Sequence, residues 1–231
     1  MKRLFVFLLA GVLLCAPACK KAQVPSAPEK PAIETGDLLF VGIPMNYGDD
    51  DMASAIADAT SQGDSLNFIH TAILEVDSLG TVWVIDATIA HGVDRHPLDT
   101  LFSDFTLHRG DAQATFEVMR LKDNHNAVQY VEQAKEFLGE EYDLYFMAFN
   151  GRHYCTELVS DAYVDDDGYR PFEPEPMNFK NAEGEFPSYW IRLFAQLGEP
   201  IPQDELGTNP QLMHSSPNLL HVTYLTNPYQ N

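Results

Sequence analysis

Two apolar runs joined by a short polar turn constrain the fold of this chain more than any other sequence feature. Residues 67–76 and 81–88 are rich in β-branched and aromatic side chains, and Asp77-Ser-Leu-Gly80 lies between them. This pattern is typical of a β-hairpin. We expect residues 78–80 to form a three-residue loop in which Gly80 is left-handed.

That loop fixes the register of the predicted hairpin. Asp77 then pairs with Thr81, and Ala72 lies opposite Asp86. His70, two residues before Ala72, is opposite Thr88 and shares a face of the ribbon with Asp86. A shift of one residue would place the two on opposite faces, so the prediction depends on the turn.

His70 and Asp86 are unusual within these runs. Diagonal neighbours on one face have Cβ atoms somewhat under about 7–8 Å apart, close enough for an imidazole and a carboxylate to form a hydrogen bond. A lone histidine on an apolar strand is most often a packing residue with a satisfied hydrogen bond. However, an acid within Val-Ile-Asp86-Ala is costly to bury without a partner. Each residue therefore explains the other.

The N-terminus is typical of a bacterial export signal. Met1-Lys-Arg3 precedes an apolar run that ends at Cys15, which is shorter than the roughly 20 residues that span a bilayer. Small residues at positions 16 and 18 stand before Cys19, a pattern that resembles a lipobox. We expect residues 1–18 to be a lipoprotein-type signal peptide and Cys19 to carry lipid. A plain secretory peptide is the alternative.

The segment after the predicted lipidation site is rich in proline and alanine and poor in large apolar residues. Such a composition cannot build a core and favours an extended tether. We therefore predict a lipidated cysteine and flexible tether over residues 19–35 and one folded domain over residues 36–231. The expected location is the bacterial cell envelope, as a periplasmic or outer-membrane lipoprotein.

Cys155 is then the only thiol of the folded domain. An unpaired cysteine in an oxidising compartment is either an inert buried thiol or a reactive one. Polar residues and glycine precede Cys155, and Leu158, Val159 and Ala162 share its face of a predicted helix. At the start of a helix, unpaired N–H groups and the positive end of the helix dipole favour a thiolate. Cys155 is therefore a candidate nucleophile.

A nucleophilic thiol requires a base, and His70 is the best placed of the eight histidines. His91 and His96 are expected in a solvated loop. His221 lies in another strand-like run and would give the order of ordinary papain-like enzymes, cysteine before histidine. It lacks a nearby acid in the pattern of Asp86, so we rank it behind His70.

Together these segments resemble a known family. Gly36-Asp-Leu-Leu-Phe-Val41, the two hairpin strands and Tyr-Cys155-Thr-Glu-Leu-Val are similar to the permuted papain-like hydrolases of the YiiX group, which are relatives of the NlpC cell-wall peptidases. The resemblance spans roughly residues 36–165, and residues from Asp166 onward add little to it. The resemblance implies an α+β, circularly permuted papain-like (NlpC-like) fold, with a central antiparallel sheet flanked by helices.

The resemblance also implies roles for individual residues. Cys155 would be the nucleophile, His70 the general base and then acid, and Asp86 the residue that orients the imidazole, although the family's acid is commonly glutamate. The reaction would be acyl transfer to water through a thioester, with a peptide or an acyl-amide or ester as substrate. The alternative is a non-catalytic envelope lipoprotein that binds a peptide or an acylated ligand on the same fold.

Charge and motifs exclude other classes. The chain has 14 Lys and Arg against 34 Asp and Glu, a formal net charge of −20, so a nucleic-acid partner is not expected. Contact with a membrane is expected only through the lipid on Cys19. There is no His-Glu-x-x-His, Cys-x-x-Cys or phosphate-binding glycine loop, and we expect neither a metal nor a cofactor.

The remaining chain is predicted as alternating strands and helices. Residues 38–43, 115–121 and 221–225 are expected to be strands, and residues 52–60, 98–102 and 188–197 helices. Residues 126–138 carry Val128, Val131, Ala134 and Leu138 at helical spacing. We expect this apolar face to pack against the sheet.

Overall fold

The computed structural model describes residues 33–44, 47, 50–61, 63, 66–106 and 112–230. The predicted signal peptide, Cys19 and residues 19–32 of the predicted tether lie outside the described residues. Within the described residues, no helix has both the length and the apolar character needed to cross a membrane.

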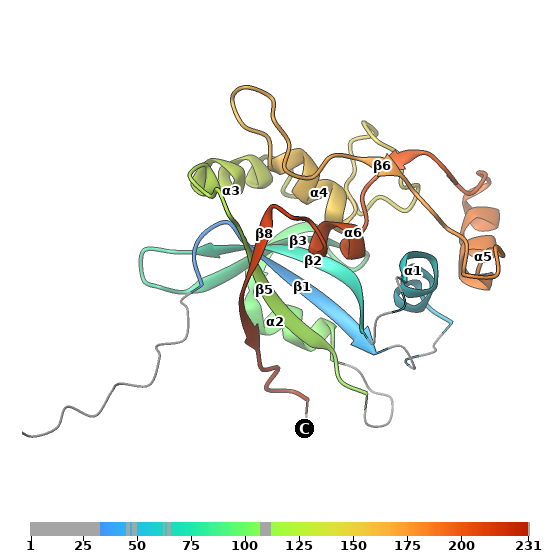
Figure 1. Ribbon diagram of the computed structural model, residues 1–231, viewed down its shortest axis with the longest axis horizontal. Coiled ribbons are helices and arrows are strands. Elements are labelled where there is room, and N and C mark those ends of the chain that lie inside the picture. The colour runs from blue at the N-terminus through green and yellow to red at the C-terminus, as the bar shows by residue number, and fades with distance from the viewer. Residues whose placement is uncertain are drawn as a thin grey trace, which may run out of the picture. The chain divides into compact units, whose positions relative to one another are not determined.

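A six-stranded antiparallel sheet forms the centre of the domain, with the strand order β4-β3-β2-β1-β5-β8 (Figure 1). The strands are β1 Asp37–Pro44, β2 Leu66–Val76, β3 Val82–Thr88, β4 Gly92–Pro97, β5 Thr115–Leu121 and β8 Leu219–Leu225. The predicted strands at 38–43, 67–76, 81–88, 115–121 and 221–225 are thereby confirmed within a residue or two. A small ribbon of β6 Glu175–Pro176 and β7 Leu206–Gly207 completes the β-structure.

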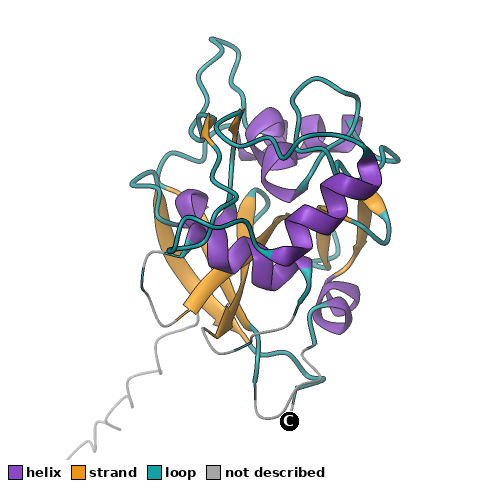
Figure 2. Ribbon diagram, turned by 90° about the vertical axis from the view of Figure 1, so that its right-hand side faces the viewer, coloured by secondary structure: helices purple, strands orange, loops and turns teal. Residues whose placement is uncertain are grey.

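Helices cover both faces of the sheet. They are α1 Met52–Thr60, α2 Leu98–Asp104, α3 Ala127–Glu136, α4 Cys155–Ala162, α5 Ser188–Leu197 and α6 Pro210–His214. Helices α3 and α4 lie over one face and α2 under the other (Figure 1). Seen from the side of α1 and α5, helices cross in front of the strands (Figure 2). The α+β fold with a helix-flanked antiparallel sheet is therefore confirmed.

Side chains of β1 alternate between the two layers because successive strand residues point to opposite faces. Leu38 and Phe40 pack in the cluster that includes Tyr130 of α3 and Leu158 of α4. Their neighbours Leu39 and Val41 join the cluster that includes Leu101 and Phe102 of α2. All four β1 side chains are fully buried, so β1 reads as a continuous apolar run.

The hairpin of β2 and β3 has the predicted register. The Asp77 N–H donates to the Thr81 carbonyl at 3.0 Å, and Gly80 is left-handed with φ of 81°. Ile73 lies opposite Ile85, which is the alignment that brings Ala72 level with Asp86. Turn chemistry thus fixes which residues of the two strands share a face.

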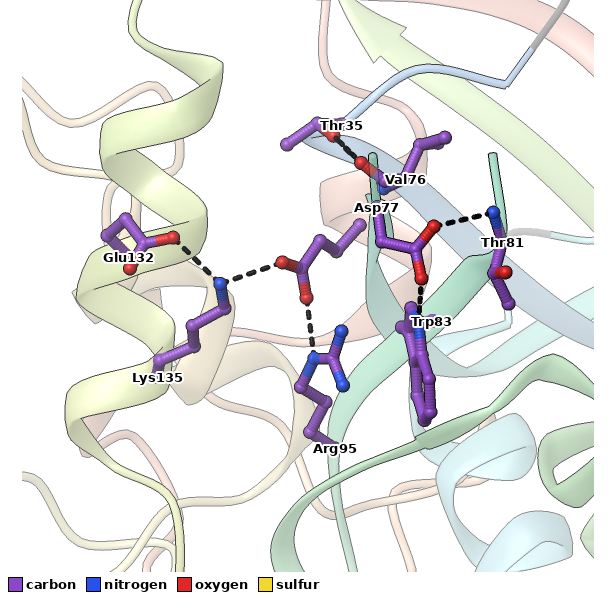
Figure 3. A network of polar contacts seen from close by, with 9 residues as sticks. Thr35, Val76, Asp77, Thr81, Trp83, Arg95, Glu132 and Lys135 are labelled. Carbon is purple, nitrogen blue, oxygen red and sulfur yellow. Dashed lines mark hydrogen bonds and ion pairs between the residues drawn. The ribbon is translucent and has the colours of Figure 1, made fainter. Parts of the chain in front are cut away.

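Polar contacts hold the turn and its flanks (Figure 3). One oxygen of Asp77 accepts from the Thr81 N–H at 2.9 Å, and the other accepts from Trp83 Nε1 at 3.0 Å. Nearby, Glu75 of β2 binds Lys135 of α3 at 2.7 Å and Arg95 of β4 at 2.6 Å. This carboxylate joins α3, β2 and β4. It therefore links β2 and β4, the two strands on either side of β3, which carries Asp86.

One prediction about an element was wrong, and another was confirmed only in part. Residues 92–97, expected in a loop, form strand β4. The predicted apolar face of the helix packs into the core at Val131 and Ala134, whereas Val128 is 65% exposed and Leu138, beyond the end of α3, is 40% exposed. The helix also buries Tyr130, whose ring stacks on Tyr163 with centroids 4.6 Å apart.

Candidate active site

Cys155 is the first residue of α4, as predicted from the polar residues that precede it. Its side chain is buried, with the residue 4% exposed, and it is a free thiol. Leu158, Val159 and Ala162 share its helix and lie fully buried in the main core. This apolar face packs α4 against β2 and β3, and it thereby fixes the thiol next to the hairpin.

His70 and Asp86 meet across the hairpin. His70 Nε2 lies 2.7 Å from Asp86 Oδ2, and both side chains are almost fully buried. Their predicted common face is therefore confirmed. The Phe105 ring lies against the imidazole with centroids 4.6 Å apart, so packing as well as the hydrogen bond restricts the ring.

The electrostatics of this group favour a charged imidazole. Burial alone lowers the pKa of His70, but the charge of Cys155, the hydrogen bond to Asp86 and hydrogen bonding with Cys155 raise it to about 10. Burial likewise raises the pKa of Asp86, but its hydrogen bonds with His70 and His96 lower it to about 2. Because the carboxylate can only accept, His70 Nε2 carries a proton, and Nδ1 is the nitrogen left for the thiol.

His96 is a site residue that the sequence analysis missed. It was expected in a solvated loop, but it lies on β4 with an exposed fraction of 6%. Its Nε2 is 3.0 Å from Asp86 Oδ1. The pairing of His96 with Val84 places it beside Asp86. The polar sequence Asp94-Arg-His96 does not have the pattern of a strand. The sequence feature that could have indicated a second turn and a further strand is Gly92, which is left-handed after a short turn.

His221 and His153 have other partners. The prediction that His221 lacks a nearby acid was wrong, because its Nδ1 lies 2.7 Å from Glu117 Oε1 on the adjacent strand β5. The same carboxylate binds His214 at 3.0 Å. His153, two residues before the thiol, binds Glu140 at 2.7 Å. None of these three rings lines the pocket next to Cys155.

A small pocket opens beside the thiol, with a cavity volume of about 50 Å³. Tyr142, Phe146, Phe179 and Trp190 line it together with Cys155. Trp190 belongs to α5, and its cluster also includes Ala55 of α1. Residues beyond Asp166, which contributed little to the sequence resemblance, therefore build much of the wall around the thiol.

Tyrosine hydroxyls near the site are held by structural contacts. The Tyr154 hydroxyl accepts from the Thr208 N–H at 2.9 Å, and the Tyr142 hydroxyl lies 3.7 Å from the sulfur of Met52. Burial is the main cause that raises the pKa of both phenols. Both hydroxyls therefore remain protonated donors at neutral pH.

Glu157 is a buried acid one turn into α4. Burial, with smaller contributions from the charges of Asp143 and Asp161, raises its pKa to about 8, although the charge of His153 opposes this shift. Its carboxyl group also accepts from the Tyr154 N–H at 3.4 Å. The folded protein thus binds a proton at Glu157 more tightly than the unfolded chain does.

We therefore expect Glu157→Gln to stabilise the protein by an amount that grows as the pH rises from about 4.5 to about 8. Stability from this group is complete below about pH 4.5 and is lost as the pH rises through about 8. At pH 9 the variant should gain on the order of 3 kcal/mol, or roughly 5–10 °C in Tm, and at pH 5 almost nothing. Thermal unfolding at both pH values measures this, with exposed Glu199→Gln as the control. An equal Tm change at both pH values would contradict the assignment.

The described residues hold no group of three His, Cys, Asp or Glu side chains arranged to bind a metal ion. His70, Asp86 and His96 have suitable ligand atoms, but each histidine directs Nε2 at a carboxylate oxygen within hydrogen-bond distance. These residues do not fit a metal centre as they stand, and we derive no step through a metal.

Comparison with known proteins identifies related chains. A family model described as "Permuted papain-like amidase enzyme, YaeF/YiiX, C92 family" matches residues 32–223. The uncharacterized protein YiiX of Escherichia coli (strain K12) is 31% identical over 91 residues, which are 39% of this chain and 44% of that protein. The matched segment thus spans less than half of that relative.

A solved structure has the same fold. The crystal structure of the metalloprotein YiiX from Escherichia coli O157:H7 superposes with a TM-score of 0.61 at 23% sequence identity. The match covers 87% of this chain and 99% of that one. The family match extends to residue 223, so the resemblance continues well beyond residue 165, where it was predicted to end.

Proposed function

The chain belongs to the family of permuted papain-like amidases, and we propose that it is a cysteine hydrolase that cleaves an amide or ester bond through a thioester. The observation that carries the proposal is the buried series of Asp86, His70 and Cys155. The carboxylate binds one imidazole nitrogen at 2.7 Å, and interaction with the thiol raises the pKa of the same ring. This is the order of acid, base and nucleophile that acyl transfer requires.

The reaction follows from these positions. The Cys155 sulfur attacks the substrate carbonyl carbon, and the His70 imidazolium gives its proton to the leaving amine or alcohol as the C–N or C–O bond breaks. A water molecule then loses a proton to neutral His70 and attacks the thioester, which releases the acid and the thiolate. The backbone N–H of Cys155, the first residue of α4, is the natural first donor to the oxyanion.

The pocket supports a substrate that combines apolar and hydrogen-bonding groups, such as a peptide or an acyl-amide or ester. Several aromatic rings line it, but three buried polar atoms of its lining residues have no hydrogen-bond partner among the described residues. They are Thr156 Oγ1, Thr208 Oγ1 and Trp190 Nε1. Buried polar atoms without partners are uncommon, and they are frequent where a ligand binds.

The proposal includes export and a membrane anchor. Residues 1–18 have the pattern of a lipoprotein signal peptide, and Cys19 is the proposed lipidated residue. The hydrolase would then act in the cell envelope at the end of the tether. Labelling with radioactive palmitate, compared between the natural chain and Cys19→Ala, tests the anchor independently of the activity.

We expect His70→Ala to lower the rate of Cys155 alkylation by iodoacetamide at pH 6.5 by about tenfold or more. A thiol without a partner is roughly 1% ionised at that pH, whereas a thiolate paired with an imidazolium is mostly ionised. The resulting gain in alkylation rate is smaller than the gain in ionised thiol, because a stabilised thiolate is a weaker nucleophile. Rates are measured by peptide mapping, which separates Cys155 from Cys15 and Cys19.

His221→Ala is the matched control for this experiment, because His221 also binds a carboxylate on the same sheet. It should leave the rate of Cys155 alkylation unchanged. If His221→Ala lowers the rate and His70→Ala does not, the base is misassigned. If natural Cys155 reacts only above pH 8 and neither substitution matters, the chain is better described as a non-catalytic binding protein with an inert buried thiol.

A further inference from the structure

Asp86 binds two histidines from two different strands. It lies on β3, between β2 and β4 in the sheet. Nε2 of His70 on β2 lies 2.7 Å from Asp86 Oδ2, and Nε2 of His96 on β4 lies 3.0 Å from Asp86 Oδ1. Each carboxylate oxygen is therefore held by a different ring, and all three side chains are almost fully buried.

The contacts of His96 define its protonation. Its Nδ1 lies 3.0 Å from the carbonyl oxygen of Pro97, and its Nε2 faces the Asp86 carboxylate. Both partners only accept, so both ring nitrogens carry protons and His96 is an imidazolium. Burial lowers the pKa of His96, but the hydrogen bond and charge of Asp86, the Pro97 carbonyl and the charge of Asp94 raise it.

Other charged groups nearby are engaged elsewhere. Arg95, adjacent in β4, binds Glu75 at 2.6 Å. Asp104 of the neighbouring helix α2 lies 3.7 Å from His91. Apart from Asp94, Asp86 is thus the acid that holds the His96 proton, and the two form a buried ion pair beside His70.

We propose that His96 is a positioning residue that fixes the Asp86 carboxylate, so that Oδ2 remains directed at His70 and Nδ1 of His70 remains directed at Cys155. With His70 as its single partner, the carboxylate would be free to rotate and exchange its oxygens. The bond from His96 removes that freedom, as outer hydrogen-bond partners do for metal-binding histidines. The inference rests on the proposed function, since it assigns a role in the same site.

Two substitutions of similar size separate the contacts of His96. His96→Gln places an amide N–H₂ near the position of Nε2, so it can still donate to Asp86. His96→Asn has a shorter side chain, with its N–H₂ near the position of Nδ1, and retains only the Pro97 contact. The readout is the rate of Cys155 alkylation by iodoacetamide in the full-length chain at pH 6.5 and pH 9.5, with Tm measured alongside.

We expect His96→Asn to lower the alkylation rate at pH 6.5 by about tenfold, the lower end of the effect of such outer partners, and to leave the rate at pH 9.5 unchanged. At pH 9.5 the thiolate forms without help, whereas a loosened fold would expose the thiol and speed labelling at both pH values. His96→Gln should recover most of the rate at pH 6.5. His221→Gln, which alters the bond to Glu117, should match the natural chain throughout.

Three outcomes overturn the inference. If His96→Asn labels like the natural chain at pH 6.5, or if His96→Asn and His96→Gln change the rate equally at both pH values, His96 is only structural. In both cases, if His70→Ala still lowers the rate of Cys155 alkylation at pH 6.5 as expected, the proposed hydrolase function stands. If the natural chain itself reacts only above pH 8 and His70→Ala has no effect, the proposed function and the role of His96 fail together.

Discussion

Cys155→Ala is expected to lower kcat/KM for ester or amide hydrolysis by at least about a thousandfold, because removing the nucleophile of such a catalytic group abolishes covalent catalysis. The free energy of unfolding should change by only about 1 kcal/mol, since a small side chain is lost from a buried site. p-Nitrophenyl acetate is a suitable first substrate. Its hydrolysis reports the rate, and intact-mass spectrometry reports the acetyl thioester.

The control for this prediction uses the other two cysteines. A chain with Cys15→Ala and Cys19→Ala retains Cys155 and should hydrolyse the ester at the natural rate. Peptide mapping should locate the acetyl group on Cys155 in that chain. Hydrolysis that persists in Cys155→Ala at the natural rate would show that another group carries the reaction.

The largest effect on stability is expected for Asp86→Ala, at about 3–5 kcal/mol, because removal of one partner leaves buried charge uncompensated. Two buried imidazoles, those of His70 and His96, lose their acceptor at once. Urea unfolding at pH 7 measures the loss. Alkylation of Cys155 at pH 6.5 should also slow, since no carboxylate then holds the charged His70 ring in its orientation.

Glu117→Ala is the matched control for Asp86→Ala, because Glu117 also bridges two histidines. The side chains of His214 and His221 are 21% and 46% exposed, so water can replace part of the lost bonding and the destabilisation should be smaller. Cys155 alkylation should be unchanged. Equal slowing of alkylation in both variants would mean that the effect reports general loosening of the sheet.

The hairpin and its register could be predicted because local chemistry determines them. Asp77 and Gly80 specify a turn whose geometry depends on only a few residues, and that turn sets which side chains share a face. The contact of His70 with Asp86 followed from this register alone. The start of α4 at Cys155 was predictable for a similar reason, since polar residues and glycine mark the beginning of an apolar helical pattern.

What could not be predicted depends on contacts between distant segments. His96 lies in a polar strand whose pairing with β3 becomes visible only in the folded sheet. The burial of Tyr130 on α3 involves Tyr163, a residue far along the chain that stacks on it. The pocket needs Trp190 of α5 next to α1, a contact that no local pattern encodes. The periodicity of apolar residues predicts the helices and strands, whereas tertiary packing determines which of their faces are buried and which elements are neighbours.

The central claim is that Cys155 and His70 form an ion pair in the resting protein, in which His70 holds the proton. The difference in ultraviolet absorbance at about 240 nm between the natural chain and Cys155→Ser measures the thiolate directly. The account predicts a thiolate band in the natural chain that His70→Ala removes. A band of equal size at every pH in the natural chain and in His70→Ala would contradict it.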